Sequence, residues 1–450
     1  GAFGLDQVLW ANTGGTISSV LSDMEWMAGY SNSPEAVNHS LGYGTATTDY
    51  STSDPFIDAY ARQYDIMVTK SAGNGSWGAT STTMTYPATA YNIMVVANMD
   101  DQNTLGRSDD VRRASSSTGP TVGGRKKPDI TAPGTSIMST NKDWATGDDF
   151  ISKTGTSMAA PHVAAAALLL ADATGNTTPR AQKAILINTA DAWTSNDTET
   201  TADDGPVAGS HWDKSYGWGY LDMQEAYFNR SDYFNGSLVG RNNNATDDDY
   251  KLYAGPMFSN EKATVVWEKR SSGYNASAPP TTQHVLTDIE VNLYDESSGL
   301  VVDYDIDSND NVHQVATASS IDAVIKVYTW STTIDGSSTE EFSLATEENF
   351  SLANPPSFNL SLSYPSIIGV SKNFTLTTTV TNTGDVASFH NNTTLSLPSG
   401  FSLVSGDNPA SLGTIAAGAS KQASWTVQSS GTQGAFSLTA TNSSASYAET

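Results

Sequence analysis

The sequence of 450 residues has no cysteine, which excludes a disulfide framework and a thiol nucleophile. Basic residues are scarce as well: 22 lysines and arginines stand against 48 aspartates and glutamates, a formal net charge of −26. Such a surplus of acid argues against nucleic acid and anionic membranes as partners. The longest stretch without a polar side chain, Val163–Ala171, is far too short to cross a bilayer, so we expect no membrane span.

Two features bear on the location of the protein, and each has a second explanation. The acidic charge suits a protein that stays soluble outside the cell, and it also fits simple surface solvation. Asn-x-Ser/Thr triplets, at Asn235, Asn275, Asn373 and Asn391 among others, fit an exported and glycosylated chain. A sequence this rich in serine and threonine also produces such triplets by composition alone. We expect a secreted or cell-surface protein.

The chain is organised around the stretch Thr154-Gly-Thr-Ser-Met-Ala-Ala-Pro-His-Val163. A short turn leads to Ser157, and the apolar run Val163–Ala171 that follows predicts a helix buried on all sides, with Gly175 as its stop. Ser157 then lies at the N-terminal end of this helix, where unpaired backbone N–H groups and the positive end of the helix dipole meet. A serine nucleophile in this place has a donor ready for the oxyanion that its attack creates.

From Gly155 to Ala164 this stretch resembles, without a break, the serine motif of the subtilisin family of serine peptidases. A Gly/Ser turn before a core helix is the plainer explanation, but a ten-residue match is hard to obtain by chance. The resemblance implies that Ser157 attacks the peptide carbonyl and forms an acyl-enzyme. It assigns His162, inside the helix, to the packing of the motif and not to catalysis.

Further pieces resemble the same family and follow the family's order. Ser40-Leu41-Gly42 resembles the edge strand that pairs with the substrate backbone, and Ser71-Ala-Gly-Asn-Gly75 resembles the turn that carries the oxyanion-hole asparagine. Ser116–Thr135 resembles a longer loop found in part of the family. Each piece alone is a weak signal, and their common order is a strong one. The resemblance implies catalytic roles for Ser157 and Asn74 and substrate-binding roles for Ser40, Leu41, Gly42, Ala72, Gly73 and Thr85.

The resemblance also covers the specificity pocket, which holds the side chain of the substrate residue just before the cleaved bond. Thr85, directly before Tyr86-Pro87, takes the position of the pocket floor, which is often glycine in the family. Gly75 takes the rim position at which relatives can carry an acid. A threonine at the floor leaves less room for a large ring, and a glycine at the rim removes an attraction for lysine or arginine. The resemblance therefore implies a preference for small or medium uncharged residues.

The histidine base and the orienting aspartate of a serine triad are missing. In the family they precede the serine in the motifs Asp-(Ser/Thr)-Gly and His-Gly-Thr-His, and neither motif occurs before Ser157. None of the six histidines is followed by glycine, and His39, beside the substrate-strand motif, is expected to be a strand residue and not a base. The chain thus resembles a subtilisin-like domain without its first part, either as a fragment, which we favour, or as a true pseudoenzyme.

Two hypotheses about function follow from these motifs. The first is a secreted subtilisin-like serine endopeptidase that hydrolyses peptide bonds through Ser157, present here as a fragment that is inactive alone. The second is a non-catalytic surface or binding protein that reuses the fold. Polypeptides are the expected partners under the first hypothesis, and the oligomeric state stays open.

The pattern of apolar residues predicts an α/β domain over residues 1–230, with a parallel sheet and helices on both faces. Helices are expected around Val20–Met27, from Asp54-Pro55 and from Thr178-Pro179 to Asn188. Buried strands are expected at Glu35–Leu41, Ile66–Thr69 and Ile93–Ala97.

The sequence pattern predicts an all-β structure for residues 231–450. Residues 231–352 resemble the jelly-roll sandwich that follows many subtilisin-like domains, with strands at Ala263–Trp267, Ile289–Tyr294 and Ala323–Trp330. The alternation along Ile289–Tyr294 predicts a half-buried strand. Residues 353–450 follow a Pro-rich linker and read as an immunoglobulin-like sandwich, in which Phe374–Val380, Ala423–Val427 and the pair Phe436 and Leu438 alternate with polar residues.

No cofactor is expected for catalysis, and a structural calcium ion stays open. Asp247–Asp249 and the stretch Asp303–Asp310 are rich in carboxylates, the ligands that calcium prefers. Neither has a recognisable ligand spacing, and we favour a solvated acidic loop in both cases. The metal site is therefore unknown from the sequence.

Overall fold

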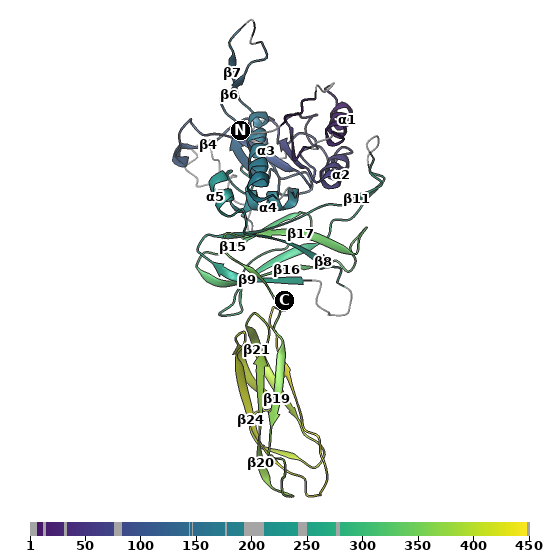
Figure 1. Cartoon of the computed structure of the whole chain (residues 1–450), viewed down its shortest axis with the longest axis vertical. Coiled ribbons are helices and arrows are strands. Elements are labelled where there is room, and N and C mark those ends of the chain that lie inside the picture. Colours follow the sequence, from purple (N-terminus) through teal and green to yellow (C-terminus); the bar gives the residue numbers. More distant parts are fainter. Residues whose placement is uncertain are drawn as a thin grey trace.

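The computed structural model describes residues 7–11, 15–30, 34–75, 83–143, 145, 147–175, 178–192, 211–241, 250–275 and 280–447. These residues form three parts that follow one another along the long axis of the molecule (Figure 1). An α/β domain occupies one end, a two-sheet sandwich lies in the middle, and a second sandwich occupies the other end.

The α/β domain is built on a five-stranded sheet whose members are β1 (Ala36–His39), β2 (Met67–Ser71), β3 (Met94–Asp100), β4 (Val111–Arg112) and β5 (Ile130–Pro133). Strands β1, β2, β3 and β5 pair in parallel, and only β4 runs antiparallel. Its helices are α1 (Ile17–Ala28), α2 (Asp54–Tyr64), α3 (Thr156–Thr174), α4 (Pro179–Asn188) and α5 (Met223–Phe228). One face of the sheet packs with α3 and α4, and the other with α1 and α2. This arrangement confirms the predicted fold class.

Local sequence signals explain where several of these helices begin and end. The Thr16 side chain accepts a hydrogen bond from the backbone of Ser19 and caps α1. Helix α2 has a proline in its first turn, as does α4, where the missing N–H group costs nothing. Gly175 ends α3 in the left-handed conformation, with φ of 67°.

Helix α3 is the central helix of the domain, and one expectation about it is wrong. It contacts β1, β2, β3 and β5, yet Leu169 remains 38% exposed, so the helix is not buried on all sides. A helix that lies on one face of a sheet keeps an outer side unless another layer covers it. By length and hydropathy α3 passes the test for a membrane span, but 56% of that window is buried within the protein. We regard it as a core helix.

The middle part is a sandwich of two antiparallel sheets, in agreement with the predicted all-β region. The first sheet has the order β15-β10-β17-β8, formed by Val312–Ala316, Lys262–Trp267, Thr339–Ala345 and Tyr233–Val239. The second has the order β14-β13-β16-β9-β18, formed by Val301–Asp305, Ile289–Asp295, Ile321–Thr329, Tyr250–Met257 and Ser351–Ala353. The short strands β11 (Ser271–Ser272) and β12 (Thr282–Gln283) pair beside it.

The terminal part is a smaller sandwich. Its sheets are β19-β20-β24-β22, formed by Phe358–Ser363, Asn373–Asn382, Ser420–Gln428 and Ser402–Ser405, and β23-β21-β25, formed by Ala410–Ile415, Ser388–Ser396 and Thr439–Ser443. The predicted alternation in β20 and β24 is confirmed, with Trp425 in the core. The expectation for Phe436 is wrong: it lies before β25 and is 42% exposed.

The three parts share buried contacts. Val266, Val312 and Ala345 of the middle sandwich belong to the same apolar cluster as helices α3 and α4. At the other junction Tyr294 packs edge-on against Tyr447, with ring centroids 5.2 Å apart. Tyr294 is therefore only 4% exposed, and the prediction of a half-buried strand β13 fails there because the terminal sandwich covers it.

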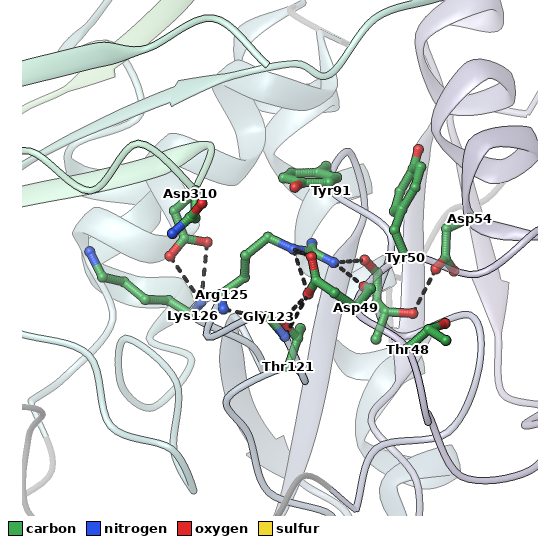
Figure 2. A network of polar contacts seen from close by, with 12 residues as sticks. Thr48, Asp49, Tyr50, Asp54, Tyr91, Thr121, Gly123, Arg125, Lys126 and Asp310 are labelled. Atoms are coloured by element: carbon green, nitrogen blue, oxygen red, sulfur yellow. Dashed lines mark hydrogen bonds and ion pairs between the residues drawn. The ribbon is translucent and has the colours of Figure 1, made fainter. Parts of the chain in front are cut away.

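A network of buried charges ties the α/β domain to the middle sandwich (Figure 2). Arg125 is 1% exposed, and its Nε donates to both carboxylate oxygens of Asp49 at 3.1 and 3.2 Å. The next residue, Lys126, donates its backbone N–H to Asp310 and its ammonium group to Asp305 at 2.9 Å. Burial, partly offset by Lys126, raises the pKa of Asp310 to about 7.

This network corrects the expectation for the acidic stretch Asp303–Asp310. Asp305 and Asp310 are 7% and 3% exposed, so these carboxylates do not form a solvated loop. They serve as partners for a lysine nearly 180 residues earlier in the chain, which sequence spacing does not reveal. Asp247–Asp249 lie outside the described residues.

Candidate active site

Ser157 lies in the first turn of α3, as the sequence motif predicts. The helix begins at Thr156, and the chain reaches it from the hairpin of β6 (Ile137–Thr140) and β7 (Phe150–Lys153), which projects from the domain in Figure 1. The backbone N–H of Gly155 donates to the carbonyl oxygen of Gly134 at 2.8 Å, so the chain returns to the point where the hairpin began. Ser157 is thus held on a rigid helix and remains partly exposed.

The side chain of Asn74 is oriented by the residue before the serine. Its Oδ1 accepts hydrogen bonds from the backbone N–H of Thr156 at 3.0 Å and from the Thr156 hydroxyl at 3.2 Å. With the oxygen occupied in this way, the amide NH₂ remains as a donor beside the N-terminal end of α3. Glycine suits position 155 because its φ of 156° is rare for other residues, and a Cβ atom there would also lie only 3.2 Å from Asn74 Nδ2.

Ser40 contacts Ser157 directly. The Ser157 hydroxyl donates to the Ser40 carbonyl oxygen at 3.0 Å, and the Ser40 hydroxyl donates to the Ser157 carbonyl oxygen at 3.0 Å. Ser40-Leu41-Gly42 follows β1 as extended chain outside the strand itself, with Leu41 42% exposed. The predicted role of this segment in binding a substrate backbone stays a prediction.

The remaining predicted substrate-binding residues surround Thr85. The backbone N–H of Thr85 donates to the carbonyl oxygen of Ala72 at 2.9 Å. A Cβ atom on Gly42 would lie 2.4 Å from Thr85 Oγ1, and one on Gly73 would lie 2.9 Å from Thr85 Cγ2. The Thr85 side chain therefore fills the space between the segments of Gly42 and Gly73. Gly75 tolerates no side chain either, because a Cβ atom there would lie 2.7 Å from the Thr83 carbonyl oxygen.

No histidine hydrogen-bonds to Ser157, and all six histidines lie in the described part of the chain. His39 is a buried residue of β1, as expected, and burial together with the nearby Lys70 lowers its pKa to about 3. His162 contacts the Met158 carbonyl oxygen at 2.9 Å within α3, which agrees with a packing role. No histidine of the described residues is therefore placed beside Ser157 as a base.

Metal ligands do not gather within the described ranges: no group of three or more His, Asp or Glu side chains there is placed to hold an ion. The carboxylates of Asp305 and Asp310 are engaged by Lys126. A structural calcium ion stays a prediction, because calcium also binds backbone and amide oxygens.

Sequence reasoning gave no role to Thr156 and Ser117, which hold the site together. Thr156 Oγ1 accepts the backbone N–H of Gly73 at 3.2 Å and so joins the helix to the turn of Asn74. Ser117 Oγ accepts the backbone N–H of Gly75 at 3.0 Å and donates to the Thr83 carbonyl oxygen at 2.7 Å. Thr156 belongs to the serine motif and Ser117 to the loop Ser116–Thr135. The sequence therefore identified both segments, but it could not predict their hydrogen bonds to the turn of Asn74.

Comparison with known proteins agrees with this geometry. The sequence profile of the subtilase family matches residues 7–219. The serine protease AprX of Bacillus subtilis is 31% identical over 206 residues, which are 42% of this chain and 47% of AprX. Residues 7–219 form a subtilase-like domain. Subtilisin NAT of Bacillus subtilis subsp. natto is 36% identical over 165 residues, which are 36% of this chain and 37% of the relative.

This subtilase-like chain covers only part of its relatives: it spans about half the length of AprX and less of subtilisin NAT. Among solved structures, a protease of Pseudoalteromonas arctica PAMC 21717 is 24% identical, with a TM-score of 0.36, over 48% of this chain and 59% of that one. In the terminal sandwich, residues 371–444 match the profile of the NPCBM-associated, NEW3 domain of alpha-galactosidase.

Proposed function

We propose that this chain carries the nucleophile and oxyanion part of an extracellular serine endopeptidase. Ser157 attacks the carbonyl carbon of a peptide bond, and an acyl-enzyme forms on Oγ as the amine leaves. Asn74 Nδ2 and the backbone N–H of Ser157 donate to the oxyanion of the tetrahedral intermediate. Ser40–Gly42 and Ala72–Gly73 bind the substrate backbone, and the Thr85 side chain limits the pocket.

The orientation of Asn74 is the observation that carries this proposal. An asparagine amide is useful in an oxyanion hole only if its NH₂ group faces the reacting carbonyl. The two hydrogen bonds from Thr156 to Asn74 Oδ1 occupy the oxygen of the amide, and they leave its NH₂ group as the donor that our proposal requires. A surface protein without catalysis has no need of this arrangement.

The general base and its aspartate come, in our proposal, from a segment that precedes Gly1. Strand β1 is the last strand of the sheet order and pairs only with β2 among the described strands, so its other edge is free. A cavity of about 390 Å³ is lined by residues 9–11, by side chains of α1 and by Val37–Leu41. It extends to Ser40, the residue that contacts Ser157.

The test joins this chain to its upstream coding sequence and measures hydrolysis of a peptide amide. The joined protein should hydrolyse the substrate, and Ser157→Ala should abolish the reaction while the protein remains folded. The 450-residue chain alone should show no Ser157-dependent turnover. A joined protein that folds and binds peptides without cleaving them would favour the non-catalytic alternative.

A further inference from the structure

Three segments of the terminal sandwich meet at the end that lies farthest from the α/β domain (Figure 1). They are residues 364–372 between β19 and β20, residues 397–405 with β22, and residues 429–438 between β24 and β25. Tyr447, which packs against the middle sandwich, lies at the opposite end of the same strands. We call these three segments the distal tip.

Apolar side chains of the distal tip are exposed to solvent in each of its three segments. Ile367 is 90% exposed, and its aliphatic side chain is the most exposed of the group. The other exposed members are Tyr364, Val370, Leu403, Val404 and Phe436. Single exposed apolar residues are common on proteins, but a group of them at one place marks an interaction surface.

Hydrogen bonds and ring contacts hold the three segments together. The backbone N–H of Ser371 donates to the carbonyl oxygen of Ser430 at 3.1 Å and so joins the first segment to the third. The ring of Phe401 packs against Phe436, with centroids 4.9 Å apart, and joins the second segment to the third. On its other side Phe401 packs against the core residue Phe374 at 6.4 Å. The exposed apolar side chains therefore belong to one ordered surface.

Charge is distributed unevenly along the chain, and the distal tip lies in its neutral part. Residues 353–450 contain two lysines and three acidic residues, a net charge of −1, so residues 1–352 carry the other −25. The distal tip contains no acidic residue, and its one charged side chain is the exposed Lys372. The tip can therefore be covered without the desolvation of a carboxylate, which burial of the acidic surface elsewhere would require.

We propose that the distal tip docks on the surface of a lipid bilayer with uncharged, zwitterionic headgroups. Its exposed side chains are mainly aliphatic, and it has none of the tryptophan and arginine that dominate protein–protein interfaces. Tyr364 precedes Ile367 by three residues and supplies the amphipathic ring that suits the headgroup region. The chain as a whole, at −26, is repelled by anionic lipid, so the apolar contact selects an uncharged surface.

The insertion is shallow, because only side chains on the tip segments enter the apolar region. The protein then lies on the bilayer and does not span it. The α/β domain is at the other end of the long axis and is held away from the lipid (Figure 1). This inference does not involve Ser157 and holds or fails whether or not the chain is a peptidase.

Sedimentation of the 450-residue chain with phosphatidylcholine vesicles tests the proposal. Ile367→Ser removes three side-chain carbons, and each methylene moved into the apolar region contributes about fourfold to partitioning. Because insertion is shallow, we expect the partition coefficient to fall at least about tenfold. Leu105→Ser is the matched control: it removes as many carbons from a fully exposed position of the α/β domain and should leave partitioning unchanged.

Site-specific labels give a second readout that does not depend on the strength of binding. The chain has no cysteine, so Ile367→Cys and Leu105→Cys each provide a single attachment point for a fluorophore. Nitroxide-bearing lipids in the vesicles should quench the label at position 367 and leave the label at position 105 unchanged. This result would place the distal tip itself in contact with lipid.

Partitioning that falls with Ile367→Ser and not with Leu105→Ser, together with quenching at position 367 alone, supports the inference. The absence of vesicle binding, binding unaffected by Ile367→Ser, or binding that requires anionic lipid would overturn it. Self-association of the chain that Ile367→Ser abolishes, without vesicle binding, would assign the tip to a second copy of the chain and would overturn it as well.

Discussion

Replacing Thr85 by glycine should widen the specificity pocket of the completed enzyme. The Thr85 side chain occupies the space between Gly42 and Gly73, within 2.4 and 2.9 Å of the Cβ positions that these glycines lack. Its hydroxyl is 3.5 Å from the Ala72 carbonyl oxygen, so the substitution gives up only a long hydrogen bond. The backbone N–H of residue 85, which donates to the same oxygen at 2.9 Å, is retained.

The size of the effect follows from the atoms removed. Thr85→Gly takes away three side-chain atoms, Cβ, Oγ1 and Cγ2, from the floor between the two glycine segments. One methylene of fit in such a pocket changes kcat/KM by about 10- to 200-fold, or ~1–3 kcal/mol. We use the value for a single methylene because a flat ring fills only part of the vacated space. The ratio of kcat/KM for phenylalanine over alanine substrates should therefore rise about 10- to 200-fold.

The assay compares peptides that differ only in the residue before the cleaved bond, in competition and at high salt. High salt is needed because a net charge of −26 attracts basic peptides to the surface at low ionic strength. Thr85→Ser is the matched control: it keeps Oγ1, loses only Cγ2 and should raise the ratio less. An unchanged ratio in Thr85→Gly, or a wild-type preference for phenylalanine over leucine or for arginine, would refute the assignment of Thr85 and Gly75.

Three further outcomes are expected. In the completed enzyme Asn74→Ala should lower kcat by about 10²–10³-fold with little change in KM. This magnitude is the one known for the oxyanion-hole asparagine of subtilisin and is carried over here. An unchanged kcat would remove Asn74 from the oxyanion hole. Lys126→Met should lower the free energy of unfolding by about 3–5 kcal/mol, because Asp305 loses its lysine partner while it stays buried and keeps the Gln314 backbone N–H at 3.3 Å. Adding Asp305→Leu should recover most of this loss in denaturant unfolding. Burial raises the folded-state pKa of Asp310 to about 7, so its contribution to stability is present at low pH and is lost as the pH rises through 7. The free energy of unfolding of the wild type relative to Asp310→Asn should therefore fall between pH 4 and 7 and then level off. A difference between the two proteins that does not change with pH contradicts this.

Elements with strong local signals could be predicted from the sequence. Helices α2 and α4 begin where a proline follows a polar residue, and α3 ends at Gly175, because these residues act through their own backbone geometry. Strand β10 follows from a short apolar run and strand β13 from apolar alternation. The failure at Tyr294 has a different origin: the residue is covered by Tyr447, and no local pattern carries information about a neighbour 153 positions away.

In the candidate site, too, local sequence signals predict some features and long-range contacts determine the others. The motifs identified Ser157, Asn74 and Thr85 because a short segment carries each of them. The hydrogen bonds from Thr156 to Asn74 and the paired contacts of Ser40 with Ser157 join segments 82 and 117 residues apart, so they required the fold. Lys70 likewise looks like an ordinary strand residue in the sequence, and only the fold shows that it is completely buried.

The central claim is that Ser157 is a peptidase nucleophile whose base lies upstream. The most direct measurement is the rate of peptide-amide hydrolysis by the chain joined to its upstream sequence, beside its Ser157→Ala variant and the 450-residue chain. The account predicts turnover only in the joined protein with Ser157 intact. Ser157-dependent turnover by the 450-residue chain alone would contradict the missing base, and a folded joined protein without turnover would contradict the peptidase itself.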